Sequence, residues 1–256
     1  MKGARPADPP LKFDFHLHTL DDPWDHHVYH TAFELIDKAV DLGFGALAIT
    51  LHGMQMESAE VEAYARERDI LLLPGVEQNV EGFHVLLINF DRETAHGIAT
   101  FADLARAKAP GNLVIAAHPY YPNATCLGEK LREHRSLFDA VEVSGFYHRA
   151  WNPNLKAMAV ARELGLPLVG NSDTHTLEQF GTTWSEIRCP KDIPSLIRGI
   201  KDGKAQVRGR ALGLGEMGIV TWKVVARGYM KWINYKKTRG FALGADQNFK
   251  VTPGIR

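Results

Sequence analysis

The chain has 256 residues, of which 45% are apolar and 23% charged, and its 30 basic residues balance its 30 acidic residues. This composition excludes disordered and collagen-like chains, and the length suits one large barrel or two small domains. The two cysteines, Cys126 and Cys189, are far apart and outside any Cys-x-x-Cys spacing, which predicts a reducing, cytoplasmic compartment and no thiolate zinc site. No apolar leader and no run of roughly 20 apolar residues is present, so neither export nor a membrane span is expected.

The zero net charge hides an asymmetry along the chain. Residues 201–256 carry 12 basic and 3 acidic side chains, a net charge of +9, so residues 1–200 carry a net charge of −9. We therefore predict an N-terminal arm over residues 1–12, a barrel over residues 13–203, and a basic C-terminal extension over residues 204–256 that packs on the barrel.

Short apolar runs alternate with longer amphipathic stretches, which is typical of repeated βα units. The predicted strands are Phe13–His18, Ala46–His52, Ile70–Leu73, His84–Phe90, Leu113–His118, Ala140–Ser144, Pro167–Asn171 and Thr182–Ile187. The predicted helices are Thr31–Leu42, Ser58–Arg68, Thr94–Lys108, Asn152–Leu164 and one near Pro194–Asp202. Thr31 and Glu34 form a capping-box pattern at the start of the first helix.

Most of the predicted strands end in, or are followed by, a histidine or an acid. In chain order these residues are His16 and His18, His52, Glu77, His118, and Asp173 with His175, and Glu142 lies within the sixth strand. In a (β/α) barrel the carboxyl ends of the strands meet on one face, where the active site is built. Residues 16 and 18 are two apart on a strand, so both imidazoles project in the same direction.

A single His-x-His or a single strand-end histidine is usually structural, but the whole set predicts metal binding. Imidazoles and carboxylates without thiolates suit Zn, Mn or Fe, and they exceed the four ligands that one tetrahedral ion needs. We therefore expect two or three divalent ions. A carboxylate such as Glu77 could bridge two of them about 3.5–4 Å apart, with a shared hydroxide as the nucleophile.

These residues resemble the polymerase and histidinol phosphatase (PHP) family of metal-dependent phosphoesterases. The matching segments occur in family order over residues 13–188. They are Asp14-Phe-His-Leu-His-Thr19, Ala48-Ile-Thr-Leu-His52, Pro74-Gly-Val-Glu77, His84-Val-Leu-Leu, Ala117-His-Pro119, Val141-Glu-Val143 and Gly170-Asn-Ser-Asp-Thr-His175.

The resemblance implies an α/β fold, a distorted (β/α)7 TIM-like barrel, with a trinuclear site. By the family pattern, the first metal would be held by His16, His18, Glu77 and Asp173. The second would be held by Glu77, His84 and His118, with Glu77 as the bridge. The third would be held by His52, His175 and one residue of the loop after His18.

Two segments depart from the family pattern. The family usually has Thr-Asp-His where this chain has Thr50-Leu51-His52, which removes a polar group expected to orient His52. The loop Leu20-Asp-Asp-Pro-Trp-Asp-His-His27 lacks the usual Ser-Asp-Gly. We select Asp22 as the third-metal ligand, with Asp25 and His26 as rivals, and the site is dinuclear if none of them binds.

The leading functional prediction is hydrolysis of a phosphate monoester, of a nucleotide or a small metabolite. Glu77 would act at the metal bridge, and Arg149 with His148 would contact the phosphate, unless this pair is merely solvated. An oligonucleotide phosphodiesterase, an amidohydrolase-type hydrolase and a degenerate, non-catalytic barrel are the alternatives. Absence of a lysine at the strand ends argues against the amidohydrolase.

The basic extension contains a pattern that predicts an amphipathic helix. Lys223, Arg227 and Lys231 recur every four residues, and Trp222, Val225, Tyr229 and Trp232 line another face. Such a helix could bind nucleic acid or an anionic membrane. We favour docking of its apolar face on the barrel, so a small phosphorylated substrate is the expected partner.

Overall fold

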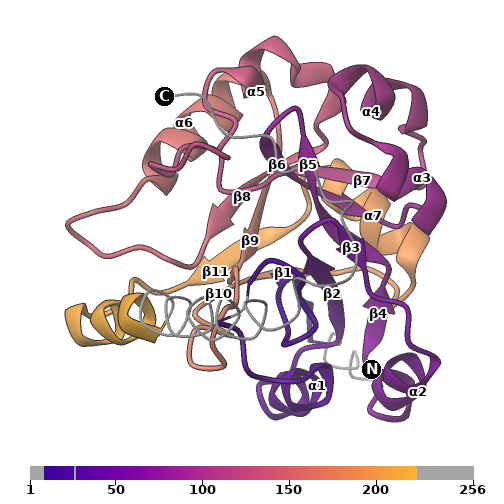
Figure 1. Cartoon of the computed structure of the whole chain (residues 1–256), viewed down its shortest axis with the longest axis vertical. Helices are drawn as coiled ribbons and strands as arrows, with labels where there is room; N and C mark the ends of the chain where they lie inside the picture. The colour runs from indigo at the N-terminus through magenta and orange to yellow at the C-terminus, as the bar shows by residue number, and fades with distance from the viewer. Residues whose placement is uncertain (1–8, 26, 224–256) are drawn as a thin grey trace, which may run out of the picture.

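Two β-sheets face each other in the computed structural model of this protein, which describes residues 9–25 and 27–223 (Figure 1). The first sheet has the order β11-β10-β1-β2-β3, with β4 also paired to β2, and the second has the order β5-β6-β7-β8-β9. The strands of the first sheet are β1 (Leu11–Leu17), β2 (Ala46–Leu51), β3 (Met54–Gln55), β4 (Leu71–Leu73), β10 (Thr183–Ile187) and β11 (Gln206–Gly209). The strands of the second are β5 (Gly75–Val80), β6 (Phe83–Ile88), β7 (Leu113–Ala116), β8 (Ala140–Ser144) and β9 (Leu168–Asn171).

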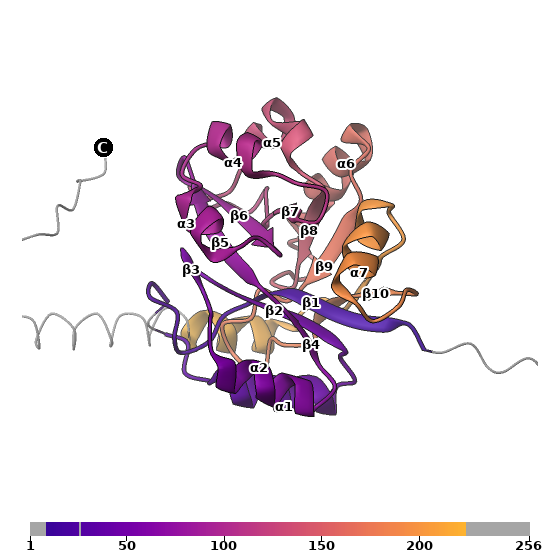
Figure 2. The same cartoon turned by 90° about the vertical axis from the view of Figure 1, so that its right-hand side faces the viewer.

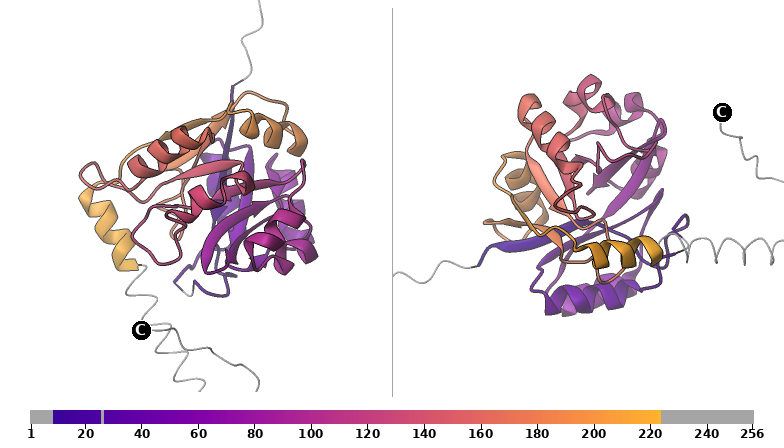
Figure 3. Two further views of the ribbon diagram at one scale, coloured as in Figure 1. Left: turned by 90° about the horizontal axis from the view of Figure 1, so that it is seen from above. Right: turned by 90° about the vertical axis from the view of Figure 1, so that its left-hand side faces the viewer.

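The helices cover the outer faces of the two sheets (Figures 2 and 3). Helices α1 and α2 lie under the first sheet, and α4, α5 and α6 lie over the second (Figure 2). The helical segments are α1 (Ala32–Asp41), α2 (Ala59–Glu67), α3 (Arg92–Gly97), α4 (Phe101–Ala107), α5 (Lys130–Glu133), the 3₁₀ turn Arg135–Leu137, α6 (Asn154–Leu164) and α7 (Ile193–Lys201). Thr31 and Glu34 form the predicted capping box at the start of α1.

One predicted helix differs from the structure, and β3, β5, β11 and α5 were not predicted. The predicted helix Thr94–Lys108 is split into α3 and α4, because the side chains of Asp91 and Thr100 each cap a new helix start. The strand β5 was missed. It forms an antiparallel hairpin with β6 through Glu81 and Gly82, which both have positive φ, as a two-residue hairpin turn requires.

The mixed α/β fold is confirmed, but the closed (β/α)7 barrel is not. The pairs β1–β2, β2–β4, β7–β8 and β8–β9 are parallel, as βα units predict, whereas β5–β6, β6–β7, β1–β10 and β10–β11 are antiparallel. No continuous ladder joins the two sheets within the described residues. The sheets adjoin along two seams, one between β1 and β9 and one between β2 and β5. One isolated parallel bridge crosses each seam: Leu17 with Thr174, and His52 with Glu77.

An apolar cluster lies between the sheets and includes alternate residues of β1. Phe13 and Phe15 belong to this inner cluster, whereas Leu17 packs in a second cluster between the first sheet and helices α1 and α2. A register irregularity between Asp14 and Leu17 changes the alternation of side chains. His16 and its neighbour Phe15 therefore both face the interior, although adjacent residues of a regular strand point to opposite faces.

Part of the basic extension is described, and it contacts the rest of the chain. Strand β11 pairs with β10, and Leu212 and Val220 are buried. Residues 214–223 are helical (yellow in Figure 1); Trp222 is 72% exposed, and Lys223 pairs with Glu178. The rest of the predicted amphipathic helix, with Val225, Arg227, Tyr229, Lys231 and Trp232, lies outside the described residues. No helix within residues 9–25 and 27–223 is long and apolar enough to cross a membrane.

Gly170 on β9 permits the close approach of β10 and β11, and this generates a stability prediction. A Cβ atom at this position would lie 2.6 Å from the Trp184 carbonyl oxygen and 2.8 Å from Val207 Cγ1. We expect Gly170→Ala to destabilise the protein by about 1–3 kcal/mol through overpacking, measured by urea unfolding. Gly97→Ala is the control, since no atom lies within 4 Å of its added Cβ. Equal stability of the two variants would contradict the close packing at Gly170.

Candidate metal centre

Ten imidazole and carboxylate side chains gather beside the two isolated bridges that link the sheets, and we call them the imidazole–carboxylate cluster. They come from β1, the loop after it, β5, β6, and the segments that follow β2, β7 and β9. The members are His16, His18, Asp22, Asp25, His52, Glu77, His84, His118, Asp173 and His175. The structure thus brings together all nine residues predicted as metal ligands and, in addition, the rival Asp25, whereas the other rival, His26, lies outside the described residues.

Glu77 lies at the centre of this cluster, and its two carboxylate oxygens face different groups of imidazoles. Oε2 lies 3.2 Å from His16 Nε2, 3.4 Å from His18 Nε2 and 3.0 Å from His52 Nε2. Oε1 lies 2.6 Å from His84 Nδ1 and 3.2 Å from His118 Nε2. This is the arrangement of a carboxylate able to bridge two ions, and Glu77 is 2% exposed.

Asp173 completes a ligand group with the two histidines of β1. Its Oδ1 lies 3.4 Å from His16 Nε2 and 3.6 Å from His18 Nε2. The bridge between Leu17 and Thr174 explains this proximity, since it places residues 16 and 18 beside residues 173 and 175 across the seam. The geometry is therefore consistent with the family assignment of His16, His18, Glu77 and Asp173 to one ion.

Glu142 holds two members of the cluster, His16 and His118, by hydrogen bonds, a role that the sequence did not reveal. Its Oε1 accepts hydrogen bonds from His16 Nδ1 at 2.9 Å and from the Asn171 amide at 2.8 Å, and its Oε2 accepts one from the His118 backbone N–H at 2.7 Å. These donors occupy both oxygens. Glu142 is thus suited to orient His16 so that Nε2 points toward Glu77. Its position inside a strand, between two valines, was the available sequence signal.

Two members of the cluster have backbone conformations that residues other than glycine rarely adopt. The φ angle is 25° at His118 and 52° at Asp173. Such conformations persist where the surrounding structure holds them, and they concentrate at functional sites. At His118 the backbone bond to Glu142 and the contact of Nδ1 with Cys126 Sγ at 3.3 Å supply that support.

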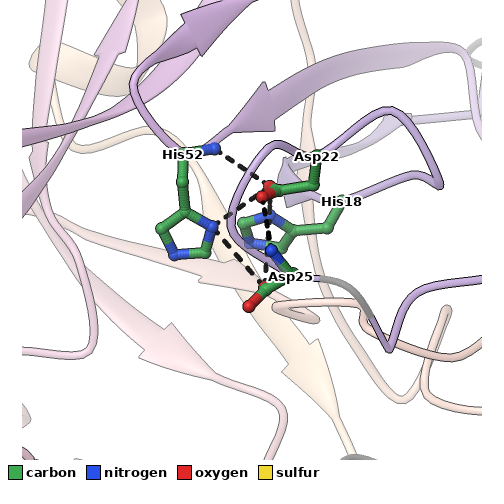
Figure 4. A group of neighbouring side chains, drawn as sticks. All are labelled: His18, Asp22, Asp25 and His52. Carbon is green, nitrogen blue, oxygen red and sulfur yellow. Dashed lines mark hydrogen bonds and ion pairs between the residues drawn. The ribbon is translucent and has the colours of Figure 1, made fainter. Parts of the chain in front are cut away.

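The loop after His18 contributes Asp22 and Asp25, which have different surroundings (Figure 4). Asp22 accepts hydrogen bonds from the Nδ1 atoms of His18 and His52. Asp25 Oδ2 lies 2.7 Å from His175 Nε2 and has no hydrogen-bond partner among the described residues. His27, which sequence reasoning did not single out, stacks on His175 with ring centroids 5.1 Å apart.

The buried charges shift the pKa values of the cluster in opposite directions. Burial lowers the pKa of His52, but the charge of Glu77 and hydrogen bonds to Asp22 and Glu77 outweigh it and raise the value to about 11. Burial likewise opposes protonation of His16, yet Glu142, Asp173 and Glu77 hold its pKa well above the usual value. Burial raises the pKa of Glu77, but His16, His84 and His52 bring it well below the usual range. Protons on imidazoles thus balance the carboxylates when no ion is present.

The donor set fits divalent metal ions. His16 Nε2, His18 Nε2, His84 Nδ1 and Asp25 Oδ2 are buried and lack a hydrogen-bond partner among the described residues. Buried polar atoms are normally hydrogen-bonded, so unpartnered nitrogens that face carboxylate oxygens are the signature of ligands. The ten side chains of the cluster exceed the four ligands that one tetrahedral ion takes.

Arg149 and His148 are not part of the cluster. Arg149 is exposed and forms no hydrogen bond or ion pair with any residue that the structure describes. His148 Nδ1 accepts a hydrogen bond from the Ala150 N–H, and the backbone of His148 pairs with that of Trp151 in a tight turn. Their predicted contact with phosphate stays a prediction.

The match to a family model confirms the resemblance to the PHP family. Residues 151–205, which include α6, β9, Asp173, His175 and β10, match the model described as PHP-associated. An uncharacterized protein of Methanocaldococcus jannaschii, MJ1587, is 25% identical over 146 residues, which cover 54% of this chain and 84% of that protein.

Two solved structures share the fold. The structure of PsfC from Pseudomonas syringae superposes with a TM-score of 0.56 at 17% identity and covers 87% of this chain and 100% of that one. An amidohydrolase from Chromobacterium violaceum, solved with bound sulfate and no metal, superposes with a TM-score of 0.53 at 19% identity and covers 76% and 97% of the two chains.

The raised imidazole pKa values predict that metal binding releases protons. At pH 7 the metal-free cluster holds protons on His52 and His175, whose pKa values are raised to about 11 and about 9, and the pKa values of His16 and His118 are raised as well. An imidazole must lose a proton to bind an ion, so affinity for Zn should rise with pH. Addition of Zn to metal-free protein in weakly buffered solution should therefore lower the pH of the sample. An affinity that is constant between pH 6 and 8 would contradict this protonation state.

Proposed function

We propose that this protein is a metal-dependent phosphoesterase that hydrolyses a phosphate monoester. The observation that carries the proposal is the position of Glu77, with one oxygen toward His16, His18 and His52 and the other toward His84 and His118. A carboxylate that faces two imidazole groups is suited to hold two ions at a fixed separation. Two or three ions of Zn, Mn or Fe fit this donor set.

Divalent ions bound there would lower the pKa of a coordinated water and neutralise charge that develops on a phosphoryl group. The protein side chains fix where this chemistry occurs. We assign His16, His18, Glu77 and Asp173 to the first ion, and Glu77, His84 and His118 to the second. His52, His175 and one acid of the loop after His18 would hold the third.

A phosphate ester also needs positive charge from the protein around its free oxygens. Arg149 is the candidate for this role, because it follows β8, the strand of Glu142, and it is exposed and unpaired within the described residues. His148, beside it in the same turn, is the second candidate. In this proposal both groups bind the substrate rather than the ions.

Phosphate is favoured over amide substrates by two observations. The family resemblance is to phosphoesterases, and the PHP-associated match supports it. Of the described residues, no lysine lies in the cluster that would suit an amidohydrolase with a carbamylated ligand. That hydrolase class remains the second candidate.

The proposal predicts metal-dependent phosphate release. Protein loaded with Mn or Zn should hydrolyse p-nitrophenyl phosphate or a nucleoside monophosphate, and chelators should abolish this. His16→Ala should lower turnover at least 10²-fold, because it removes a ligand at the centre of the cluster. His96→Ala is the matched control, since His96 is exposed on α3 and outside the cluster.

The same samples should be offered bis-p-nitrophenyl phosphate, an amide and a lactone. Hydrolysis of an amide or lactone without phosphate release would contradict the proposal and favour the amidohydrolase. Faster cleavage of the diester than of the monoesters would instead indicate a phosphodiesterase.

The role of Arg149 can be read from the kinetics of Arg149→Ala. If the guanidinium binds the phosphate of the ground state, KM should rise about 10-fold or more with little change in kcat; if it acts on the transition state, kcat should fall. Arg162→Ala, an exposed arginine on α6, serves as the control. Unchanged KM and kcat in Arg149→Ala would remove this residue from the site.

A further inference from the structure

His52 has a carboxylate partner although the chain departs from the family pattern beside it. Leu51 is fully buried in the apolar cluster with Leu35 and Ile36 of α1 and Val61 of α2. Position 51 therefore faces the helices, not the ring of His52. The orientation of His52 is instead set from the loop after His18, by Asp22.

The Asp22 carboxylate lies beside the Nδ1 atoms of His18 and His52 (Figure 4), whose rings stack on each other with centroids 4.7 Å apart. Its Oδ2 accepts hydrogen bonds from His18 Nδ1 at 2.9 Å, from His52 Nδ1 at 3.1 Å and from the His52 backbone N–H at 2.9 Å. Its Oδ1 accepts from the backbone N–H groups of Trp24 and Asp25, both at 2.9 Å. Asp22 is 4% exposed, so these five donors occupy it fully.

These bonds determine which nitrogen of each ring is available. An imidazole whose Nδ1–H donates to a carboxylate presents the lone pair of Nε2. In both rings Nε2 is the atom near the bridging carboxylate, at 3.4 Å from Glu77 Oε2 for His18 and 3.0 Å for His52. Asp25 Oδ2, by contrast, has no hydrogen-bond partner among the described residues and lies beside His175 Nε2.

We propose that Asp22 is a positioning residue rather than a metal ligand, and that it holds His18 and His52 for two different ions. In the assignment above, His18 belongs to the first ion and His52 to the third, so one carboxylate couples the two positions. Asp25 then supplies the loop ligand of the third ion. This inference rests on the proposed metal centre, and it replaces our sequence-based selection of Asp22 as that ligand.

The test compares Asp22→Asn, Asp25→Asn and the control Asp21→Asn, whose carboxylate is on the exposed side of the same loop. Bound Zn is counted by mass spectrometry at saturation, and affinity is measured by competition with a chromophoric chelator. Asp22→Asn should keep the wild-type number of ions at saturation, with about 10–100-fold weaker binding of two of them. Asp25→Asn should lose one equivalent, and Asp21→Asn should match the wild type.

Loss of one equivalent by Asp22→Asn, with the other ions bound as in the wild type, would make Asp22 a ligand and overturn the inference. Wild-type affinity in Asp22→Asn would make it a spectator and overturn it equally. Phosphate release in the same samples is scored separately. Wild-type protein that binds Zn but releases no phosphate would refute the proposed reaction. The role of Asp22 would still be decided by the number and affinity of the bound Zn ions.

A second measurement on the wild type does not depend on any variant folding. In Zn-loaded protein, nitrogen NMR of the histidine rings should show His18 and His52 protonated and hydrogen-bonded at Nδ1 and ligated at Nε2. Zn at Nδ1 of either ring would overturn the inference.

Discussion

The burial of the Glu77 carboxylate among five imidazoles is the constraint on which the centre of this protein depends. An ionised carboxylate removed from water costs several kcal/mol unless opposite charges compensate it. His16, His18, His52, His84 and His118 all place a ring nitrogen within 3.4 Å of its oxygens. The raised pKa values of His16, His52 and His118 favour protons on these three rings, and protons there or metal ions between the rings make the buried charge tolerable.

The two seams between the sheets explain how so many polar groups can share one interior. Where a strand ladder is continuous, backbone groups and apolar side chains fill the space between neighbouring strands. At each seam only one bridge forms, Leu17 with Thr174 and His52 with Glu77, and every bridge residue is a cluster member or its neighbour. The fold therefore places side chains from both sheets around one point and keeps the apolar inner cluster below them.

A second layer of carboxylates holds the ligand rings in place. Glu142 fixes His16 and the strained backbone of His118, and Asp22 engages His18 and His52. Asp14 is a third buried acid, which accepts hydrogen bonds from Ser172; burial raises its pKa to about 7 despite those bonds. Glu142 and Asp22 thus orient the rings by hydrogen bonds, whereas Asp14 holds the backbone of His16.

The sequence by itself determined the residue types of the centre and the local signals around them. Histidines and acids at strand ends, the capping box of α1 and the parallel βα units depend on neighbours in the chain, and the structure contains them. It also determined that Glu77 would be suited to a bridge, through the order of motifs that resembles the PHP family.

Only the tertiary structure decided which side chain does what at the centre. Asp22 and His52 are 30 residues apart, and His16 and Glu142 are 126 apart, so their hydrogen bonds depend on packing that no local pattern encodes. The irregularity on β1, the hairpin that carries Glu77 and the separation into two sheets arise in the same way. Asp22 and Asp25 are equivalent as sequence letters. They differ because five donors surround the Asp22 carboxylate, whereas Asp25 Oδ2 faces His175 Nε2 at 2.7 Å.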